Sequence, residues 1–416
     1  MVVPDHSGPT SPFIILAAFC RPARRRAAAR TKSISNSAVT RHRCRAVDPT
    51  KEGCRGACAK RLSCSFYVRR GERRLHRLAL RTSRFRFNDE TLQRFNDVPS
   101  CQLASFHQLS VSLKVHILDT IQLGRPGIIA ATALETNDGI VLFDTGPEST
   151  FDNIVTALRQ IGASVNDIRH VFLSHIHFDH AGAAWRFAEL GATIYVHPRG
   201  AQHLIDPAKL IASAARIFGD DMQRLWGRIA PVPENHVRIL EDKAIVPVAP
   251  FEIRAIATPG HASHHHVYRW EDNLFGGDIA GVRLGNGPPI PPFVPPELQI
   301  ESWHESIAKI RELNPTNLYL PHFGSVKGSV AAHLDALDER VTRWSEWFRE
   351  KISAGFREPD LVAAFARLEH DDLIANGATE ELARDYETVD PSYMAVPGAI
   401  RYWQKYHPGE VFANNR

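Results

Sequence analysis

The 416-residue sequence predicts an α/β fold, because segments with strand and helix patterns alternate from about residue 112 onward. The strand segments are short, are rich in Val, Ile and Thr, and partly alternate apolar with polar side chains. Asn137-Asp138-Gly139 is a strong turn signal between two of them. Between others lie helical patterns such as residues 151–161, whose apolar side chains share one face.

The expected elements follow in chain order. Strands are expected at 113–118, 128–136, 140–143, 171–173, 193–196, near 237, and at 251–257, 265–270 and 317–320. Helices are expected at 151–161, in an insertion at 199–228, at 333–352, and in two more short segments up to about residue 409. The insertion has an apolar face, which suits either core packing or a cap over a functional site.

A sharp difference in charge divides the chain near residue 94. Residues 1–94 carry 22 Lys and Arg against 6 Asp and Glu, whereas residues 95–416 carry 28 against 40. All six cysteines also lie before residue 102. The formal net charge of +4 therefore describes neither part, and the acidic remainder is a poor match for a nucleic-acid backbone.

The basic head fits a membrane helix and a secretory signal poorly. Its apolar stretch, residues 12–20, is shorter than the about 20 residues that a membrane helix requires, and the Arg cluster at 24–26 follows that stretch. Its composition is similar to that of an organellar transit peptide, and a nucleic-acid-binding arm is an alternative. We expect residues 1–110 to be a disordered extension, or an over-extended start with true initiation near Val111 or Val115.

Metal-ligand side chains are concentrated between Ser174 and Gly182, directly after an expected strand. His175 and His177 are two residues apart, so at an extended strand end they point the same way and can bind one ion. Asp179 and His180 follow as the chain turns and can reach a second ion. This H-x-H-x-D-H spacing predicts a metal centre, with a His-rich surface turn as the alternative.

This motif resembles that of the metallo-β-lactamase fold hydrolases, and the resemblance covers about residues 112–345. Later segments match the family's remaining partners in order, with His261 in Thr-Pro-Gly-His, Asp278 in Phe-Gly-Gly-Asp and His322 in Leu-Pro-His-Phe-Gly. Asp144, in a strand that ends in Asp-Thr-Gly, is similar to the family's Asp that supports the ligand loop.

The resemblance implies an αββα sandwich with a helical insertion and a helical C-terminal extension. The catalytic domain would span residues 111–330 and the extension residues 331–416. Carried over, one metal is bound by His175, His177 and His261, the other by Asp179, His180 and His322, and Asp278 bridges them. His264 is a candidate for orienting a bound imidazole, since metal-bound histidines need such partners.

The implied chemistry is hydrolysis. Two divalent ions about 3.5–4 Å apart can share a hydroxide that attacks a carbonyl carbon. Asp179 and Asp278 are the catalytic candidates, Asp179 as the group that protonates the leaving atom. Zinc is the expected metal, with iron or manganese as alternatives, because sites of His and Asp accept all three.

The Pro-rich loop 284–297 follows Asp278 closely and is stiff, so we expect it to form a wall of the substrate pocket. Arg283 and Phe293 are the candidate substrate contacts. A plain surface loop is the alternative.

Among the family's branches, the chain is most similar to glyoxalase II, hydroxyacylglutathione hydrolase. It lacks the flavodoxin-like domain of the flavodiiron oxidoreductases, and it has Asp278 where true β-lactamases lack the bridging Asp. The residues with which glyoxalase II binds glutathione have no clear counterpart after His322, so glutathione specificity does not follow.

The expected substrate is therefore a small-molecule thioester or ester. A lactonase and a mononuclear-iron persulfide dioxygenase of the same fold are the alternatives, and so is a non-catalytic scaffold. We expect a cytoplasmic protein with no nucleic-acid or membrane partner, organellar targeting by the head being the exception. The sequence does not indicate an oligomeric state.

Overall fold

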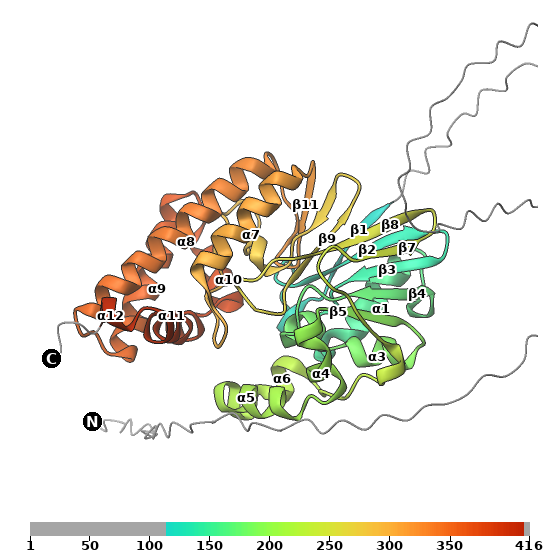
Figure 1. The fold of residues 1–416 in the computed structure, drawn as a ribbon, viewed down its shortest axis with the longest axis horizontal. Coiled ribbons are helices and arrows are strands. Elements are labelled where there is room, and N and C mark those ends of the chain that lie inside the picture. The colour runs from blue at the N-terminus through green and yellow to red at the C-terminus, as the bar shows by residue number, and fades with distance from the viewer. Residues whose placement is uncertain (1–113, 412–416) are drawn as a thin grey trace, which may run out of the picture. The chain divides into compact units, whose positions relative to one another are not determined.

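A computed structural model describes residues 114–411 of the chain. The expectations for residues 1–110 lie outside this range. Two six-stranded sheets pack face to face, with helices on both outer faces (Figure 1). This arrangement confirms the predicted α/β class and the αββα sandwich.

The first sheet takes its strands in chain order. They are β1 (Val115–Asp119), β2 (Ala130–Thr136), β3 (Gly139–Phe143), β4 (Ile168–Phe172), β5 (Thr193–Val196) and β6 (Val237–Ile239). The pairs β1–β2 and β2–β3 are antiparallel, whereas β3 to β6 are parallel. The carboxyl ends of β3, β4 and β5 therefore share one edge of the sheet, which is where the ligand motif begins.

The second sheet reads in space β12–β11–β10–β9–β8–β7. Its strands are β7 (Ile245–Val248), β8 (Phe251–Ala257), β9 (His266–Trp270), β10 (Asn273–Phe275), β11 (Asn317–Leu320) and β12 (Gly324–Ser325). Aromatic rings pack between the sheets: the ring of Phe143 on β3 stacks on that of Phe275 on β10, with 3.5 Å between centroids. The expectations missed β7, β10 and β12 because strands of two to four residues are too short to show a period.

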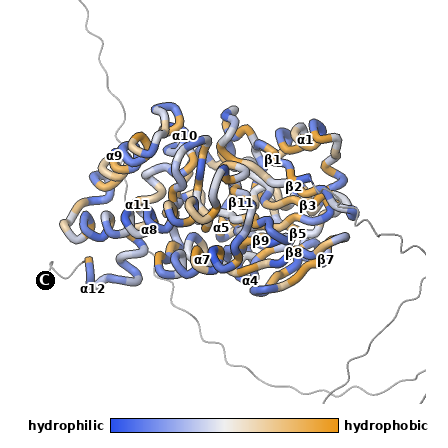
Figure 2. The backbone as a smooth tube through the Cα atoms, turned by 90° about the horizontal axis from the view of Figure 1, so that it is seen from above, coloured by the Kyte–Doolittle hydropathy of each residue, from blue (hydrophilic) through white to orange (hydrophobic). Residues whose placement is uncertain are grey.

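Helices cover both outer faces. On the first sheet and in the insertion lie α1 (Phe151–Gln160), α2 (Phe178–Ala181), α3 (Ala184–Glu189), α4 (Pro198–Ile205), α5 (Ala208–Phe218) and α6 (Met222–Trp226). On the second sheet and beyond it lie α7 (Ile300–Leu313), α8 (Val330–Ser353), α9 (Glu358–Ala375), α10 (Glu380–Val389), α11 (Ser392–Tyr406) and α12 (Pro408–Val411). Hydrophilic and hydrophobic residues alternate along α8 and α9 (Figure 2), as expected when one helix face enters a core.

The C-terminal region differs from the expectation of two short helices, which was wrong. Up to residue 411, where the description ends, four helices follow α8, and α9 and α11 are 18 and 15 residues long. Pro397 and Gly398 stand inside α11 and read in sequence as helix breakers. Gly398 is needed there because a Cβ at that position would lie 2.3 Å from the carbonyl oxygen of Phe293.

Among the helices of residues 114–411, none combines the length and apolar composition that a membrane crossing requires.

Candidate metal centre

The ligand loop leaves the carboxyl end of β4 and is held by the end of β3. Asp144, directly after β3, accepts hydrogen bonds from the backbone N–H of Ser174 at 2.7 Å and from its Oγ at 2.8 Å. Asp144 has a left-handed φ of 55°, which Asp tolerates better than most residues. His177 then precedes α2, so the chain turns and Asp179 and His180 come back toward the same edge.

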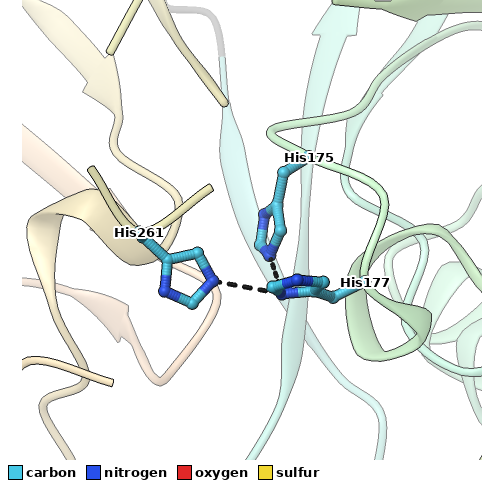
Figure 3. Close-up of side chains that lie close together, drawn as sticks. All are labelled: His175, His177 and His261. Carbon is cyan, nitrogen blue, oxygen red and sulfur yellow. Dashed lines mark hydrogen bonds between the residues drawn. The ribbon is translucent and has the colours of Figure 1, made fainter. Parts of the chain in front are cut away.

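A first cluster of three imidazoles forms beside this edge. His175 Nε2 lies 2.8 Å from His177 Nδ1, and His261 Nε2 lies 3.1 Å from the same His177 atom. Figure 3 shows the three rings with these nitrogens turned toward one another, His261 approaching from the opposite side. Three converging nitrogens form a donor set that suits a divalent ion with one position left open.

A second cluster adjoins it. His180 Nε2 lies 3.2 Å from Asp179 Oδ2, and His322 Nε2 lies 3.4 Å from both atoms. Asp278 completes the group. These four side chains are spread over more than 140 residues of sequence, and three separate loops bring them together.

Asp278 lies between the two clusters. Its Oδ2 is 3.4 Å from His261 Nε2 and 3.9 Å from His175 Nε2 in the first cluster, and 3.3 Å from His180 Nε2 in the second. Its Oδ1 is buried and has no hydrogen-bond partner within residues 114–411. A buried carboxylate oxygen without a partner is costly, so this atom fits a metal ligand better than a structural hydrogen-bond acceptor.

Four of the ligand histidines are oriented through their other ring nitrogen. Each of these nitrogens lies 3.0 Å from an oxygen: His175 Nδ1 from Ser174 Oγ, His180 Nδ1 from Asp144 Oδ2, His261 Nδ1 from the Pro292 carbonyl and His322 Nδ1 from the Ile128 carbonyl. Hydrogen bonds of this kind fix the ring and the tautomer of a metal-binding imidazole. The donor set and its supports therefore fit divalent metal ions.

The two clusters differ in charge. Burial, reinforced by neighbouring imidazoles, lowers the pKa of His175 and of His177 well below the ordinary value, and it lowers that of His261. Burial also acts on His180, but the charges of Asp179, Asp278 and Asp144 raise its pKa well above the ordinary value. These shifts favour neutral imidazoles in the first cluster and a bound proton in the second.

The structure brings all seven predicted ligands together, and Asp144 lies where the resemblance implied. His264 behaves differently from the expectation. Its ring is 5.8 Å from that of His177, and its Nε2 lies 3.8 Å from Glu297, yet no hydrogen bond joins it to a ligand within the described residues. Its neighbour His265, which packs 5.2 Å from the His175 ring and bonds Thr258, lies closer to the cluster.

The two substrate-contact candidates take structural positions. Phe293 is fully buried against Trp303, Trp344 and Phe348, so core packing explains it and contact with a substrate does not. The side chain of Arg283 donates to the carbonyls of Gly287 and Lys327 and thereby holds the Pro-rich loop.

Sequence reasoning missed the groups that support the ligands from the main chain. The carbonyls of Pro292 and Ile128 orient His261 and His322, and the backbone N–H of Arg283 donates to the His322 carbonyl. Every residue has such groups, so no residue type could have marked them. The Pro-rich loop proves to be a support of the first cluster through Pro292.

The sequence-family model described as the metallo-beta-lactamase superfamily matches residues 124–322, just under half of the chain. Over 170 residues the chain is 28% identical to the metallo-beta-lactamase fold-containing protein ST1585 of Sulfurisphaera tokodaii, covering 40% of this chain and 64% of that protein. Over 156 residues it is 27% identical to an N-acyl homoserine lactonase of Bacillus cereus, covering 32% of this chain and 54% of that protein.

The matched regions thus span less than two thirds of either relative. Among solved structures, ST1585 from Sulfolobus tokodaii superposes with a TM-score of 0.44 at 22% identity, covering 55% of this chain and 98% of that one. The metallo-beta-lactamase family protein TTHA1429 from Thermus thermophilus superposes with a TM-score of 0.48 at 19% identity, covering 70% of this chain and 93% of that one. Over residues 124–322 the chain is therefore similar in sequence to the metallo-β-lactamase superfamily, and its αββα sandwich agrees with that similarity.

Proposed function

We propose that this chain is a dinuclear-metal-dependent hydrolase that cleaves a thioester or a carboxylic ester, similar to hydroxyacylglutathione hydrolase. One observation carries the proposal: two adjacent ligand clusters converge on the single carboxylate of Asp278. Members of the superfamily are mostly metal-dependent hydrolases, which supports the reaction class.

In this proposal His175, His177 and His261 would hold one ion, Asp179, His180 and His322 would hold the other, and Asp278 would help to hold both. Zinc is the proposed metal, with iron or manganese as alternatives, because imidazole and carboxylate ligands accept all three. Bound ions would supply Lewis acidity and activate water for attack on a carbonyl carbon.

The protein's own groups divide the remaining work. The Asp278 carboxylate offsets part of the repulsion between two cations, and burial of the histidines keeps bulk water from competing for the ligand atoms. Asp179 is the most exposed member of the second cluster, with 22% of its side chain accessible, and it faces His180 and His322. We assign to Asp179 the relay of a proton from the attacking water molecule to the departing sulfur or oxygen atom.

Lactone hydrolysis is a second candidate. The observation in its favour is the sequence similarity between this chain and the N-acyl homoserine lactonase of Bacillus cereus, 27% identity over 156 residues. A lactone is a cyclic ester, so the same residues would carry out the same attack and proton transfer.

We propose a small-molecule substrate and a cytoplasmic location, without a nucleic-acid or membrane partner. A mononuclear-iron dioxygenase would need only two His and one Asp as ligands. The complete second cluster counts against it.

The test measures metal content and turnover in the full chain. The protein is loaded with zinc, its ions per chain are counted, and hydrolysis of S-D-lactoylglutathione and of a γ-lactone is followed. Asp278→Asn is the variant, and Asp272→Asn, on an exposed turn, is the matched control. We expect two ions per chain and turnover of one substrate, both reduced in Asp278→Asn and unchanged in Asp272→Asn.

Each other outcome has a definite meaning. Lactone turnover without thioester turnover would favour the second candidate. One iron per chain in the protein as isolated, before zinc is added, together with oxygen consumption, would replace the hydrolase by a dioxygenase. A protein that binds no metal under these conditions would refute the proposal.

A further inference from the structure

The carbonyl of Pro292 decides how the His261 ring is presented to the metal centre. His261 Nδ1 lies 3.0 Å from that oxygen, and a carbonyl oxygen only accepts, so in the neutral ring Nδ1 carries the proton. The other nitrogen, Nε2, is then free to bind a metal ion, and it lies 3.4 Å from Asp278 Oδ2. A displacement of the Pro292 carbonyl would therefore turn the His261 ring or release its proton from Nδ1.

The chain that leads to this carbonyl is stiff. Residues 288–292 read Pro-Pro-Ile-Pro-Pro, so φ is fixed at four of these five positions. Ile290, between the prolines, exchanges both of its backbone hydrogen bonds with Val282, each at 2.9 Å. Whatever holds the start of this stretch therefore also affects the position of the Pro292 carbonyl at its end.

Tyr386 on α10 holds the start of the stretch. Its side chain is fully buried, and its hydroxyl accepts the Leu284 N–H at 2.9 Å and donates to the Pro288 carbonyl at 2.7 Å. The loop approaches this hydroxyl so closely that a Cβ on Gly287 would lie 2.5 Å from it. One hydroxyl of the C-terminal extension thus fixes two points of the Pro-rich loop.

Gly398 on α11 holds the loop just after Pro292. A Cβ on Gly398 would lie 2.3 Å from the Phe293 carbonyl oxygen and 2.9 Å from its carbon. The same peptide group continues into the Val294 N–H, which donates to the Pro292 carbonyl at 3.1 Å. A single peptide group therefore contacts α11 on one side and the oxygen that orients His261 on the other.

The loop has little room to move away from α11. The Phe293 ring is fully buried, and its centroid lies 5.8–6.5 Å from those of three aromatic rings, Trp303, Trp344 and Phe348. Close-packed aromatic side chains do not shift without cost. A second contact from α11 follows, since Arg401 Nε donates to the Pro296 carbonyl at 3.0 Å. The C-terminal extension therefore holds the loop both before and after Pro292.

We propose that α10 and α11 set the geometry of the first cluster, with Tyr386 and Gly398 as positioning residues that act on His261 through the Pro-rich loop. This inference rests on the proposed function, because it takes His261 as a metal ligand. It adds a role for the C-terminal extension, which supplies none of the seven candidate ligands.

The first test variant is Gly398→Ala in the full chain. Alanine is favoured over glycine inside a helix by about 1 kcal/mol, so any loss of function must come from the contact with the Phe293 carbonyl. The matched control is Gly409→Ala, because Gly409 lies on α12 and a Cβ there would meet nothing within 4 Å.

The second variant is Tyr386→Phe, which removes only the hydroxyl. Its matched control is Tyr402→Phe, since Tyr402 is also buried in the extension, but its hydroxyl bonds Glu301 and His407 instead of the Pro-rich loop. A thermal melt verifies that each variant is folded. If Gly398→Ala does not fold, Tyr386→Phe decides the inference through the same measurements.

Two measurements separate positioning from a general loss of stability. The first is a zinc titration in competition with a chromophoric chelator. We expect the affinity for one ion to fall by about tenfold in both variants, the lower limit for loss of a group that orients a metal-binding imidazole. This ion should be the one whose affinity also falls in His261→Gln, and the other ion and both controls should be unchanged.

The second measurement is proton NMR of the metal-free full chain with 15N-labelled histidine. The His261 Nδ1–H is identified as the signal that is missing in His261→Gln. We expect this signal to shift, or to exchange faster with water, in Gly398→Ala and Tyr386→Phe and to stay unchanged in both controls. A role of the extension that is only structural would not move it in a folded variant.

The outcomes distinguish this inference from the proposed function. If the native chain binds two ions and both variants leave both affinities unchanged, or lower both equally, the inference is overturned and the hydrolase stands. A selective loss of one ion in a chain that hydrolyses neither thioester nor lactone would support the inference while the proposed function fails. If the native chain binds no metal, the proposed function is refuted and the His261 signal decides: an unchanged signal in both variants overturns the inference.

Discussion

Replacing Asp144 by Asn tests whether the second cluster binds metal. The carboxylate accepts the Ser174 N–H on Oδ1 and both Ser174 Oγ and His180 Nδ1 on Oδ2. If the new amide keeps its oxygen on the Ser174 N–H, its NH2 group faces His180 Nδ1. Two N–H groups cannot form a hydrogen bond with each other, so the neutral His180 ring would carry its proton on Nε2 instead of Nδ1. Nε2 is the nitrogen that faces the other candidate ligands, and a protonated nitrogen cannot bind a metal ion.

The size of the effect follows from these contacts. Loss of a group that orients a metal-binding imidazole costs about 10–100-fold in metal affinity. This corresponds to about 1.4–2.7 kcal/mol. The metal-free protein should also lose about 1.5–3 kcal/mol of stability, because a hydrogen bond to a charged group is removed at a buried position.

The assay is a zinc titration in competition with a chromophoric chelator, which resolves a tighter and a weaker ion. Asp338→Asn is the control, since Asp338 also pairs with a histidine, His304, but does so between α7 and α8. We expect one of the two affinities to fall in Asp144→Asn and neither in Asp338→Asn. Unchanged affinity for both ions in Asp144→Asn would refute the assignment of His180 as a ligand.

Three further predictions concern protons and hydrogen bonds. Despite burial, nearby carboxylates raise the pKa of His180 and of His322, so a metal ion must displace protons from these rings. The metal affinity of the second cluster should therefore rise with pH, by up to about tenfold per pH unit for each displaced proton. Equal slopes of metal affinity against pH at the two clusters would contradict this. Burial and the charge of Asp390 raise the pKa of Glu369 well above 4.5, so the folded state binds the carboxyl proton more tightly than the unfolded state. The resulting stabilisation is complete below pH 4.5 and is lost as the pH rises from 4.5 through the raised pKa of the folded state. Glu369→Gln should therefore stabilise the protein by about 1–3 kcal/mol at neutral pH and little near pH 4, and equal shifts in melting temperature at both pH values would be inconsistent with this reasoning. Tyr386→Phe should lower the free energy of unfolding in denaturant by about 1–3 kcal/mol, because the Leu284 N–H and the Pro288 carbonyl lose the buried hydroxyl as their hydrogen-bond partner. An unchanged denaturation midpoint would show that water replaces the hydroxyl.

The sequence alone determined the local part of the metal centre. His175, His177, Asp179 and His180 lie within six residues, so the geometry of one strand end and one turn suffices to place them together. The α/β class and most strands of the first sheet also follow from local patterns. For His261, Asp278 and His322 the spacing carries no such information, and only the resemblance to a family indicated them.

Tertiary structure decided the remainder, because burial and backbone partners depend on segments far apart in the chain. Phe293 looked like a pocket residue in sequence, yet α7 and α8 bury it completely. Glu369 resembles any helical surface Glu, but packing leaves its carboxylate buried without a hydrogen-bond partner in residues 114–411.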